Sequence, residues 1–508
     1  MNKRIKTLAI FLHRWMGVTF CLLFAWWFLS GTFMMYGDYP SVGAADRLAR
    51  APLLDASKIR VEPEAAYQRL ALDQPPDQVR LNMYDGRPAY RFRVGREEAL
   101  VFADDGHVQS RFSMETMLRV AAAWTGQPER SARMEFNTEE DQWTVAGQFR
   151  ALRPLLKYSW RNGDQVYVST VTGDVVQSTT RSARILAHLG PIPHWLYYTP
   201  LRKHGPLWSR TVILLSAVAT VAALLGVMVG IWMYSPLKRY SIRGASSTIP
   251  YTGQKRWHMI AGLFFGIVAC TWAFSGMLSM DPFPAPRAAA EVGARIAVAL
   301  RGGPVSLAEF AAKPARAVLA QLGPGFAVKE LEYTWMAGQL VYLASGGNAQ
   351  TQIVPLDGET LPALDQNLLF GVMRRAVRPF RPSEMRVVTK YEAYYLDRHQ
   401  RRPLPVIFVK LNDGANSMFY VDPKTARVVE SYDARSRVNR WVYRGLHSLD
   451  IPWLYAHRPA WDIAVLLLML GGVALSVTSV ILAVRVVGRV GRLWHRATLR
   501  EPLFRARI

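Results

Sequence analysis

The amino-acid sequence predicts a helical membrane protein with four transmembrane helices. These helices are arranged as two parallel tandem copies of one helix–domain–helix unit, with two α+β domains on the non-cytoplasmic side. Two observations predict this fold class. Four segments of the 508-residue chain are apolar over about 20 residues, the length that crosses a bilayer. Several residues of the first segment also recur in the third at one constant spacing.

The four predicted spans contain no Asp, Glu, Lys or Arg in their cores. They cover roughly residues 18–36, 211–234, 259–280 and 463–484. A cleaved signal peptide is the alternative for the first segment, which follows a basic start. That segment is long for the apolar part of a signal peptide, and it matches the third span. We therefore expect it to remain as a membrane helix.

The basic residues predict the orientation of the spans. Lys and Arg flank them on one side only, and this asymmetry marks the cytoplasmic face. The basic residues lie before the first span, between the second and third, and after the fourth: Lys3, Arg4, Lys6; Lys238, Arg239, Arg243, Lys255, Arg256; Arg485, Arg489, Arg492, Arg496, Arg500, Arg505, Arg507. Both termini are thus predicted to be cytoplasmic. This pattern explains much of the net charge of +24, so the bilayer and not nucleic acid is the expected partner.

The predicted organisation has eight parts. Alternating runs such as PAYRFRVG, QVYVST and PVIFVKL predict strands in the polar segments, and short helical stretches precede them. We expect a helix followed by a small antiparallel sheet, twice per domain. The parts are 1–36 (cytoplasmic N-terminus and first helix), 37–207 (first α+β domain), 208–235 (second helix), 236–256 (basic cytoplasmic loop), 257–280 (third helix), 281–460 (second α+β domain), 461–486 (fourth helix) and 487–508 (basic cytoplasmic tail).

Five residues of the first span recur in the third at the same offset. The pairs are His13 and His258, Gly17 and Gly262, Trp27 and Trp272, Ser30 and Ser275, and Gly31 and Gly276. Similarity continues outside the spans, where YVSTVTGDVVQS parallels YVDPKTARVVES and HLGPIPHWLY parallels HSLDIPWLY. Both copies begin in the cytoplasm, so a two-fold axis along the membrane normal is expected.

Histidines at the predicted membrane edges are the candidate ligands for a cofactor. His13 and His258 would meet across the two-fold axis at the cytoplasmic side, where two neutral imidazoles can ligate a haem iron. His188 and His447 would form the corresponding pair at the other side. Further candidates there are His194 and the matching pair His204 and His457. Interfacial or capping histidines are the simpler alternative, and tryptophans at span ends commonly form an aromatic belt.

Other chemistry is not visible in the sequence. There is no P-loop, no dinucleotide-binding glycine fingerprint, no HExxH and no GxSxG. Cys21 and Cys270 lie in apolar segments and form no haem-attachment or disulfide framework. The segment YYLDRHQRRPLP, with Arg398, Arg401 and Arg402, could meet an anionic ligand, although a solvated loop is the simpler interpretation.

The chain resembles the PepSY-associated transmembrane family, often labelled iron-regulated membrane proteins. The resemblance covers nearly the whole chain and rests on HRWMG, on SG after the tryptophans of the first span, on KRWHMIAGLFFG, IPHWLYYTPLR, RGLHSLDIPWLY and RPAWD, and on the strand–turn pattern VYVSTVTGDVV. It implies PepSY-like α+β domains in the periplasm and a multi-pass protein in the inner membrane of a Gram-negative bacterium. Some family members are similar to ferrisiderophore reductases with two b-type haems.

The resemblance also implies a set of haem-iron ligands. His13 and His258 would hold one haem b, and His188 and His447 the other, with His194, His204 and His457 as alternatives on the outer side. The expected activity is that of an oxidoreductase that reduces a periplasmic ferric siderophore or another ferric chelate. No flavin or nicotinamide motif is present, so quinol or a separate protein would donate the electrons.

A second hypothesis is a non-enzymatic membrane sensor or peptidase regulator. PepSY-like modules elsewhere are associated with modulating peptidases, and the two domains would then bind a peptide or a periplasmic partner. The edge histidines would be structural in that case. Haem content separates the two hypotheses, and a transporter is disfavoured by the uncharged span cores.

Overall fold

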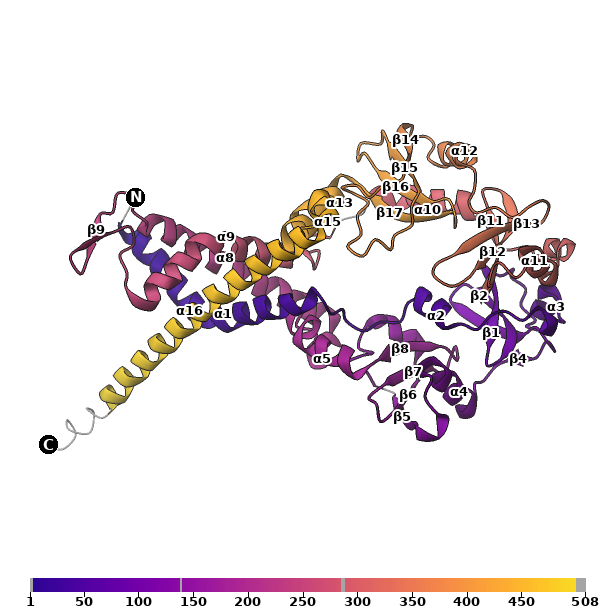
Figure 1. Ribbon diagram of the computed structural model, residues 1–508, viewed down its shortest axis with the longest axis horizontal. Helices are drawn as coiled ribbons and strands as arrows, with labels where there is room; N and C mark the ends of the chain where they lie inside the picture. Colours follow the sequence, from indigo (N-terminus) through magenta and orange to yellow (C-terminus); the bar gives the residue numbers. More distant parts are fainter. Residues whose placement is uncertain (1–2, 138, 285–287, 499–508) are drawn as a thin grey trace. The chain divides into compact units, whose positions relative to one another are not determined.

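The computed structural model describes residues 3–137, 139–284 and 288–498, so residues 499–508 of the predicted basic tail lie outside the described residues. The chain divides into two compact units. The helical unit comprises residues 3–39, 182–284 and 439–498, and the sheet unit comprises residues 40–181 and 288–438 within the described ranges. Figure 1 shows the long helices of the first unit and the sheets of the second.

Four helices in the described part of the helical unit are long and apolar enough to cross a membrane. They are α1 (Lys3–Met34), α8 (Gly205–Met233), α9 (Gly253–Leu278) and α16 (Arg458–Thr498). Each covers all or most of one predicted span, so the chain is a multi-pass membrane protein. The helix α16 has 41 residues, about 60 Å at 1.5 Å per residue, and Figure 1 shows it continuing past the other three helices.

The packing of these helices places α1 and α9 across the bundle from each other. The helix α1 packs against α8 and α16, and α9 packs against the same two. Shorter elements connect them: α5 (Arg181–Leu189), α6 (Pro191–His194), α7 (Thr199–Arg202), the hairpin of β9 (Tyr240–Ile242) and β10 (Ala245–Ser247), a π-helix (Arg440–Gly445), α14 (Leu446–Ser448) and α15 (Pro452–Ala456). The two helices that carry the matching histidines of the first pair therefore face the centre of the bundle.

The sheet unit contains three antiparallel sheets. The largest has the strand order β13-β12-β11-β1-β2-β3-β4, and the other two run β5-β6-β7-β8 and β14-β15-β16-β17. The bounds are β1 (Gln78–Tyr84), β2 (Arg87–Val94), β3 (Glu97–Phe102), β4 (Val108–Gln109), β5 (Arg133–Asn137), β6 (Leu155–Ser159), β7 (Gln165–Ser169), β8 (Val175–Thr179), β11 (Glu330–Met336), β12 (Gln339–Ser345), β13 (Thr351–Pro355), β14 (Pro382–Val388), β15 (Val406–Leu411), β16 (Met418–Asp422) and β17 (Arg427–Tyr432).

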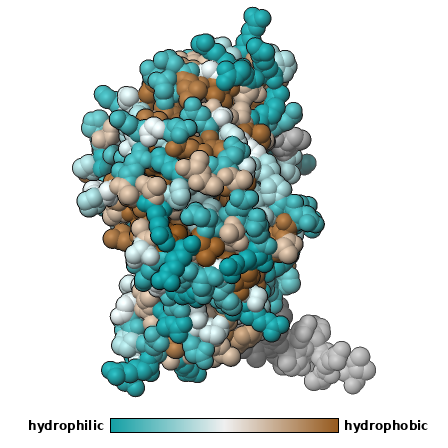
Figure 2. All heavy atoms as spheres, turned by 90° about the vertical axis from the view of Figure 1, so that its right-hand side faces the viewer, coloured by the Kyte–Doolittle hydropathy of each residue, from teal (hydrophilic) through white to brown (hydrophobic). Residues whose placement is uncertain are grey.

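A helix precedes each group of strands. The helices of the sheet unit are α2 (Ala44–Arg50), α3 (Pro63–Gln68), α4 (Met114–Thr125), α10 (Ala288–Arg301), α11 (Ala315–Leu322), α12 (Gln366–Ala376) and α13 (Ala434–Asn439). Of these, α3 precedes β1, α4 precedes β5, α11 precedes β11 and α12 precedes β14. A helix followed by antiparallel strands thus occurs twice in each polar segment, but the strands after α3 and those after α11 form one shared sheet and not two small ones. Figure 2 looks onto the sheet unit, whose visible side chains are mainly hydrophilic.

The two polar segments meet in one sheet through β1 and β11. Val79 lies opposite Tyr333 in this antiparallel pair, and Leu81 lies opposite Leu331. Tyr333 also packs edge to face against Tyr342, with ring centroids 4.7 Å apart. Such aromatic contacts contribute about 0.5–1.5 kcal/mol each beyond their buried area. The segments that we predicted as two domains therefore share a sheet and its core.

Candidate functional site

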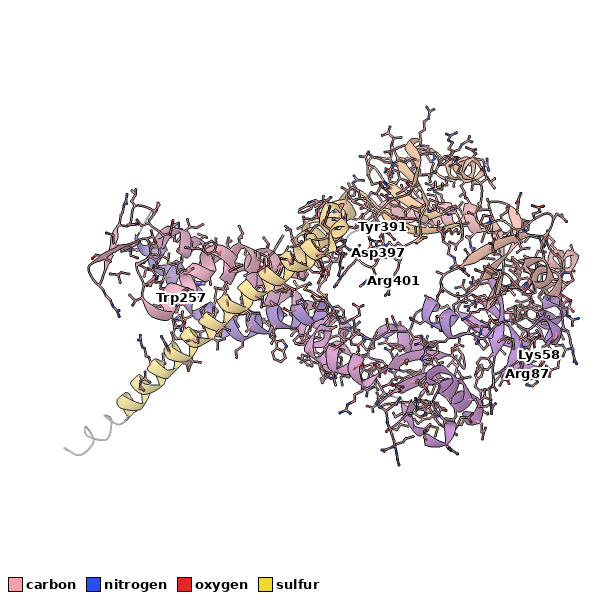
Figure 3. The ribbon with its side chains drawn as sticks, in the orientation of Figure 1. Lys58, Arg87, Trp257, Tyr391, Asp397 and Arg401 are labelled. Carbon is pink, nitrogen blue, oxygen red and sulfur yellow. The ribbon has the colours of Figure 1, made fainter. Side chains whose placement is uncertain are left out.

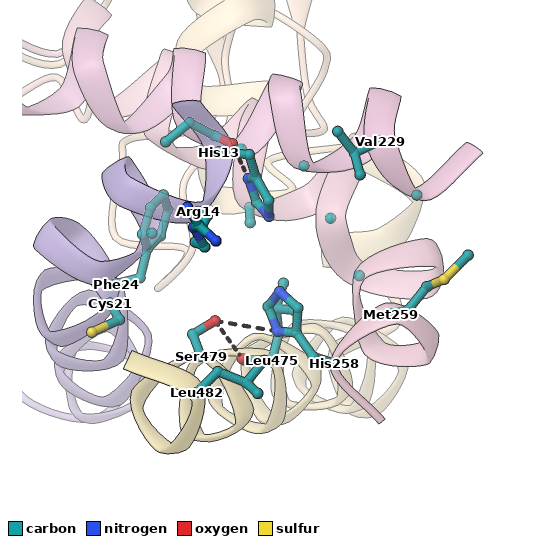
Figure 4. A pocket seen from close by; sticks show the side chains of 18 of the residues that line it. His13, Arg14, Cys21, Phe24, Val229, His258, Met259, Leu475, Ser479 and Leu482 are labelled. Carbon is teal, nitrogen blue, oxygen red and sulfur yellow. Dashed lines mark hydrogen bonds between the residues drawn. The ribbon is translucent and has the colours of Figure 1, made fainter. Parts of the chain in front are cut away.

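His13 and His258 face each other inside the helical unit. Their ring centroids lie 6.2 Å apart, and the ring planes differ by 25°. His13 lies in the first half of α1 and His258 near the start of α9, so the diagonal packing of these helices brings them together. Figure 4 shows the two rings pointing toward one another from opposite sides of a cavity.

The hydrogen bonds of this pair fix which ring nitrogen is free. The Nδ1 of His13 lies 3.1 Å from the carbonyl oxygen of Ala222, which can only accept a hydrogen bond. The Nδ1 of His258 lies 3.1 Å from the hydroxyl of Thr478, and that hydroxyl donates its own proton to the carbonyl of Leu475. Both Nδ1 atoms therefore carry hydrogen, which leaves each Nε2 with a lone pair for a metal.

A cavity of about 330 Å³ lies at this pair and is lined by all four long helices. Gly17, Gly226 and Gly262 contribute to its wall. A Cβ atom added at Gly226 would lie 2.6 Å from Cε1 of His13, so only glycine admits the imidazole there. A Cβ added at Gly17 would meet no atom within 4 Å, which shows open space beside the histidine pair. The cationic side chains of Arg14 and Lys255 also line the cavity.

A second histidine pair joins α6 and α14. His194 and His447 have ring centroids 6.0 Å apart and ring planes at 66°. The Nδ1 of His194 lies 3.1 Å from the carbonyl oxygen of Trp27 and 3.2 Å from the hydroxyl of Ser30. The Nδ1 of His447 lies 3.0 Å from the hydroxyl of Ser275, which donates to the carbonyl of Trp272. The Nε2 atoms of this pair are again the ones left with lone pairs.

The surroundings of His194 and His447 correspond residue by residue. Ser30 and Ser275, which bind the two rings, are one of the pairs that recur along the chain. Trp208 donates its indole N–H to the carbonyl of the residue after His194, and Trp461 does the same for the residue after His447. Leucines two positions after each histidine, Leu196 and Leu449, both adopt positive φ, at 52° and 50°. These correspondences match His194, and not His188, with His447.

Burial keeps both of these imidazoles neutral. His194 and His447 lie in short helices outside the four long ones. Burial, together with the neighbouring His447, lowers the pKa of His194 to about 3, and burial lowers the pKa of His447 to about 4. A neutral imidazole is the form that binds a metal, so both rings are ready to act as ligands near neutral pH.

The other candidate histidines lie apart from these pairs. His188 is exposed, and its Nδ1 lies 2.7 Å from the carbonyl oxygen of Arg184. His457 is also exposed and bonds the carbonyl of Trp453 one turn earlier. His204 is exposed at the residue that precedes α8. The structure thus brings together His13 with His258 and His194 with His447, whereas the pairing of His188 with His447 does not occur.

The geometry of each pair suits one iron atom between two imidazoles. The ring centroids lie 6.2 and 6.0 Å apart, and in each pair both Nε2 atoms would be free to bind one metal ion. In the described residues, no cluster of three or more His, Cys, Asp or Glu side chains could hold a metal ion. Two-histidine sites fit an iron whose remaining ligands belong to a macrocycle.

The two pairs lie toward opposite ends of the same two helices. His13 and Ser30 are 17 positions apart in α1, and His258 and Ser275 are 17 positions apart in α9. This spacing corresponds to about 25 Å along a helix axis, most of the thickness of the apolar part of a bilayer. The two histidine pairs are therefore separated by a distance comparable with the apolar thickness of a bilayer.

A comparison with protein-family models gives a match. Residues 11–325, more than half of the chain, match the model of a family described as PepSY-associated TM region. The matched range contains α8, α9, most of α1, both members of the first histidine pair and one member of the second, His194. No curated protein matches the chain.

Proposed function

Because the chain belongs to the PepSY-associated TM family, we propose that this membrane protein binds two b-type haems and moves electrons across the bilayer. The electrons reduce ferric iron in a chelate, such as a ferric siderophore, on the far side. The single observation that supports this most is the presence of two matched histidine pairs at iron-ligating separations, toward opposite ends of α1 and α9.

The proposed location is the inner membrane of a Gram-negative bacterium. The basic residues of the β9–β10 connection and of the end of α16 support a cytoplasmic position for that end of the bundle. The His13–His258 pair then lies toward the cytoplasm, and the His194–His447 pair lies toward the periplasm. The sheet unit, which joins the other ends of the long helices, is periplasmic in this orientation.

The residues present fit haem at the first pair. The glycines of α1, α8 and α9 leave space beside the imidazoles, and most of the cavity wall is apolar. Arg14 and Lys255 are positioned at the cavity to pair with carboxylates, and haem b carries two propionates. Haem held by two histidines supplies reversible one-electron Fe(III)/Fe(II) chemistry without an open coordination position.

In this proposal, side chains and backbone carbonyls of the protein hold and orient the imidazoles that would bind the haems. Ala222 and Thr478 fix the tautomer of the first pair, and Ser30 and Ser275 do the same for the second. In the overall reaction, each ferric ion takes one electron and becomes ferrous. A quinol donor would release two electrons and two protons, and therefore reduces two ferric ions.

Spectroscopy of the purified full-length protein tests the proposal. Protein produced with adequate haem should give a reduced-minus-oxidised difference spectrum of b-type haem, and extraction should yield two haems per chain. Dithionite-reduced protein should then be reoxidised by a ferric chelate. A protein that contains no haem under these conditions refutes the proposal, and a partner bound by such a protein would favour the sensor or regulator hypothesis.

A further inference from the structure

The sheet unit contains a large cavity that the proposed haem chemistry does not use. Its volume is about 1280 Å³, and both polar segments contribute to its wall. The lining comes from α2, β1, α4, β11 and β12, and from the chain around Arg401 and around Lys424. Eight Arg or Lys and seven Asp or Glu side chains line this cavity, so the arrangement of charges decides what it can bind.

Most carboxylates of the wall already bind specific partners. Arg91, which is 5% exposed, pairs with Glu98 at 3.0 Å and with Asp174 at 2.6 Å. The other pairs on the wall are Arg80 with Glu98 and Glu330, Arg119 with Asp85, and Arg427 with Glu332. The carboxylate of Asp422 accepts bonds from the backbone N–H of Lys424 and the hydroxyl of Thr425. These carboxylates are therefore occupied.

Four cationic side chains of the wall have no carboxylate partner among the described residues, and one of them, Arg50, lies over the ring of Trp124 instead. Within the described part of the chain, no carboxylate lies within ion-pair distance of the charged groups of the other three, Arg47, Arg401 and Lys424. They come from three different segments, and all three line the same cavity. Cations without a carboxylate partner that line one cavity are groups that can attract and hold an anion.

The loop that carries Arg401 is held rigidly. The carboxylate of Asp397 accepts the backbone N–H groups of His399 and Arg402, at 3.1 and 2.9 Å. The hydroxyl of Tyr391 donates to the carbonyl of Arg402, and the guanidinium of Arg402 is bound by Glu430. Figure 3 labels Tyr391, Asp397 and Arg401 in this part of the sheet unit. The backbone of the loop is fixed by its neighbours, so binding of a ligand restricts the Arg401 side chain without first having to order the chain that carries it.

From this arrangement we propose that the cavity is a binding site for an anionic, carboxylate-rich ferric chelate, held by Arg47, Arg401 and Lys424. That the anion is an iron chelate rests on the proposed function, whereas the anion site itself does not. The size of the cavity allows a ligand larger than a simple ion. Arg401, from the cationic and aromatic segment YYLDRHQRRPLP, thus contributes to the wall of this site.

The test uses full-length protein in detergent and two probes. Gallium(III) citrate is a carboxylate-rich chelate that is not reduced, and a ferric trihydroxamate chelate lacks negative charge. Calorimetry should detect gallium citrate binding that weakens as salt increases. Arg401→Gln and Lys424→Gln should each weaken it about threefold to tenfold, and the double variant more. Arg401→Lys keeps the charge and should retain most of the affinity.

A matched control removes the same charge elsewhere in the sheet unit. Arg161 is exposed between β6 and β7 and does not line the cavity, so Arg161→Gln should change affinity less than twofold. Unchanged binding in the double variant, an equal loss with Arg161→Gln, or equally tight binding of the trihydroxamate would overturn the proposal. Protein without haem that binds gallium citrate through Arg401 would refute the proposed function but uphold this site. Haem-containing protein whose reduction of ferric chelates does not depend on Arg401 would uphold the proposed function but refute this binding site.

Discussion

The imidazole rings of His194 and His447 lie with centroids 6.0 Å apart, although 253 positions separate them in the chain. The same separation of 253 relates Trp208 to Trp461, whose indoles fix the carbonyls next to these histidines. We therefore expect His194→Ala and His447→Ala each to remove about half of the b-type haem from the purified protein, because each leaves one iron with a single axial imidazole. Haem extraction and the reduced-minus-oxidised spectrum measure this loss.

The exposed His188 supplies the control for that prediction. His188→Ala changes a side chain outside the pair, so haem content should remain at the level of the unmodified protein. Loss of haem in His188→Ala, with retention in His194→Ala, would restore the pairing of His188 with His447 that the sequence suggests.

The first pair gives a parallel prediction. His13→Ala and His258→Ala should each remove about half of the haem signal and leave the signal of the second pair. Because the two sites differ in ring angle, 25° against 66°, their low-spin electron paramagnetic resonance signals should differ, and each variant should lose a different one. Haem content that is unchanged in both variants would exclude this pair as ligands.

Glycine substitutions test whether the space beside His13 holds the cofactor. Gly17→Leu puts a side chain into open space, so the folded chain should accept it while the haem of the first pair is lost. Gly147→Leu, at an exposed glycine of the sheet unit where an added Cβ would also meet no atom within 4 Å, is the control for a glycine change away from the bundle. Full haem loading of Gly17→Leu would show that the cofactor does not occupy this part of the cavity.

The sequence predicts the helices and the first pair because both depend on local or repeated signals. About 20 apolar residues suffice to identify a span. His13 and His258 share their offset with Gly17 and Gly262, so the same helix face is recognisable in both copies. The order of helix and sheet in each polar segment follows from alternation and turn residues in the same way.

His194 and the β1–β11 contact are harder to predict, for two physical reasons. The motifs HLGPIPHWLY and HSLDIPWLY align by their prolines, which matches His188 with His447, but the chain turns differently in α6 and α14. The constant separation shared by Trp208 and Trp461 is the signal that would have identified His194. Pairing of β1 with β11 joins residues about 250 positions apart, and neither strand sequence alone specifies its partner.

A buried ion pair close to His447 should fix the orientation of this ring in the second histidine pair. Arg440, which is 4% exposed, donates to the carbonyl of Asp450 and pairs with its carboxylate at 3.4 Å, so it spans the turn that carries His447. The position 253 residues earlier is Ala187, so the first half has no counterpart. We expect Arg440→Gln to shift the potential and the resonance signal of the second haem only, because His447 loses its support.

The exposed Arg444, four residues further along, provides the matched charge control for Arg440. Arg444→Gln should leave both haem signals unchanged. If Arg440→Gln and Arg444→Gln give the same spectrum and potential, the ion pair has no role in orienting His447. Partial recovery of the potential and the resonance signal in Arg440→Lys would support a positioning role. Lysine keeps the positive charge but lacks the planar guanidinium with its several N–H donors.

The loop that presents Arg401 should depend on pH through Asp397. Partial burial opposes ionisation of this carboxyl, but the backbone N–H groups of His399, Arg401 and Arg402 and the nearby Arg402 charge outweigh it and lower the pKa of Asp397. A lowered folded-state pKa stabilises the loop above the unfolded value of about 3.9, and this contribution disappears as pH falls through the folded-state pKa. Hydrogen exchange at residues 399–402 should therefore be about tenfold faster in Asp397→Asn than in unmodified protein at pH 7, and the difference should shrink as the pH falls below the unfolded value. Asp365→Asn, which weakens the cap of α12, should not alter exchange in this loop, and a difference that does not depend on pH would contradict the role of the ionised carboxylate.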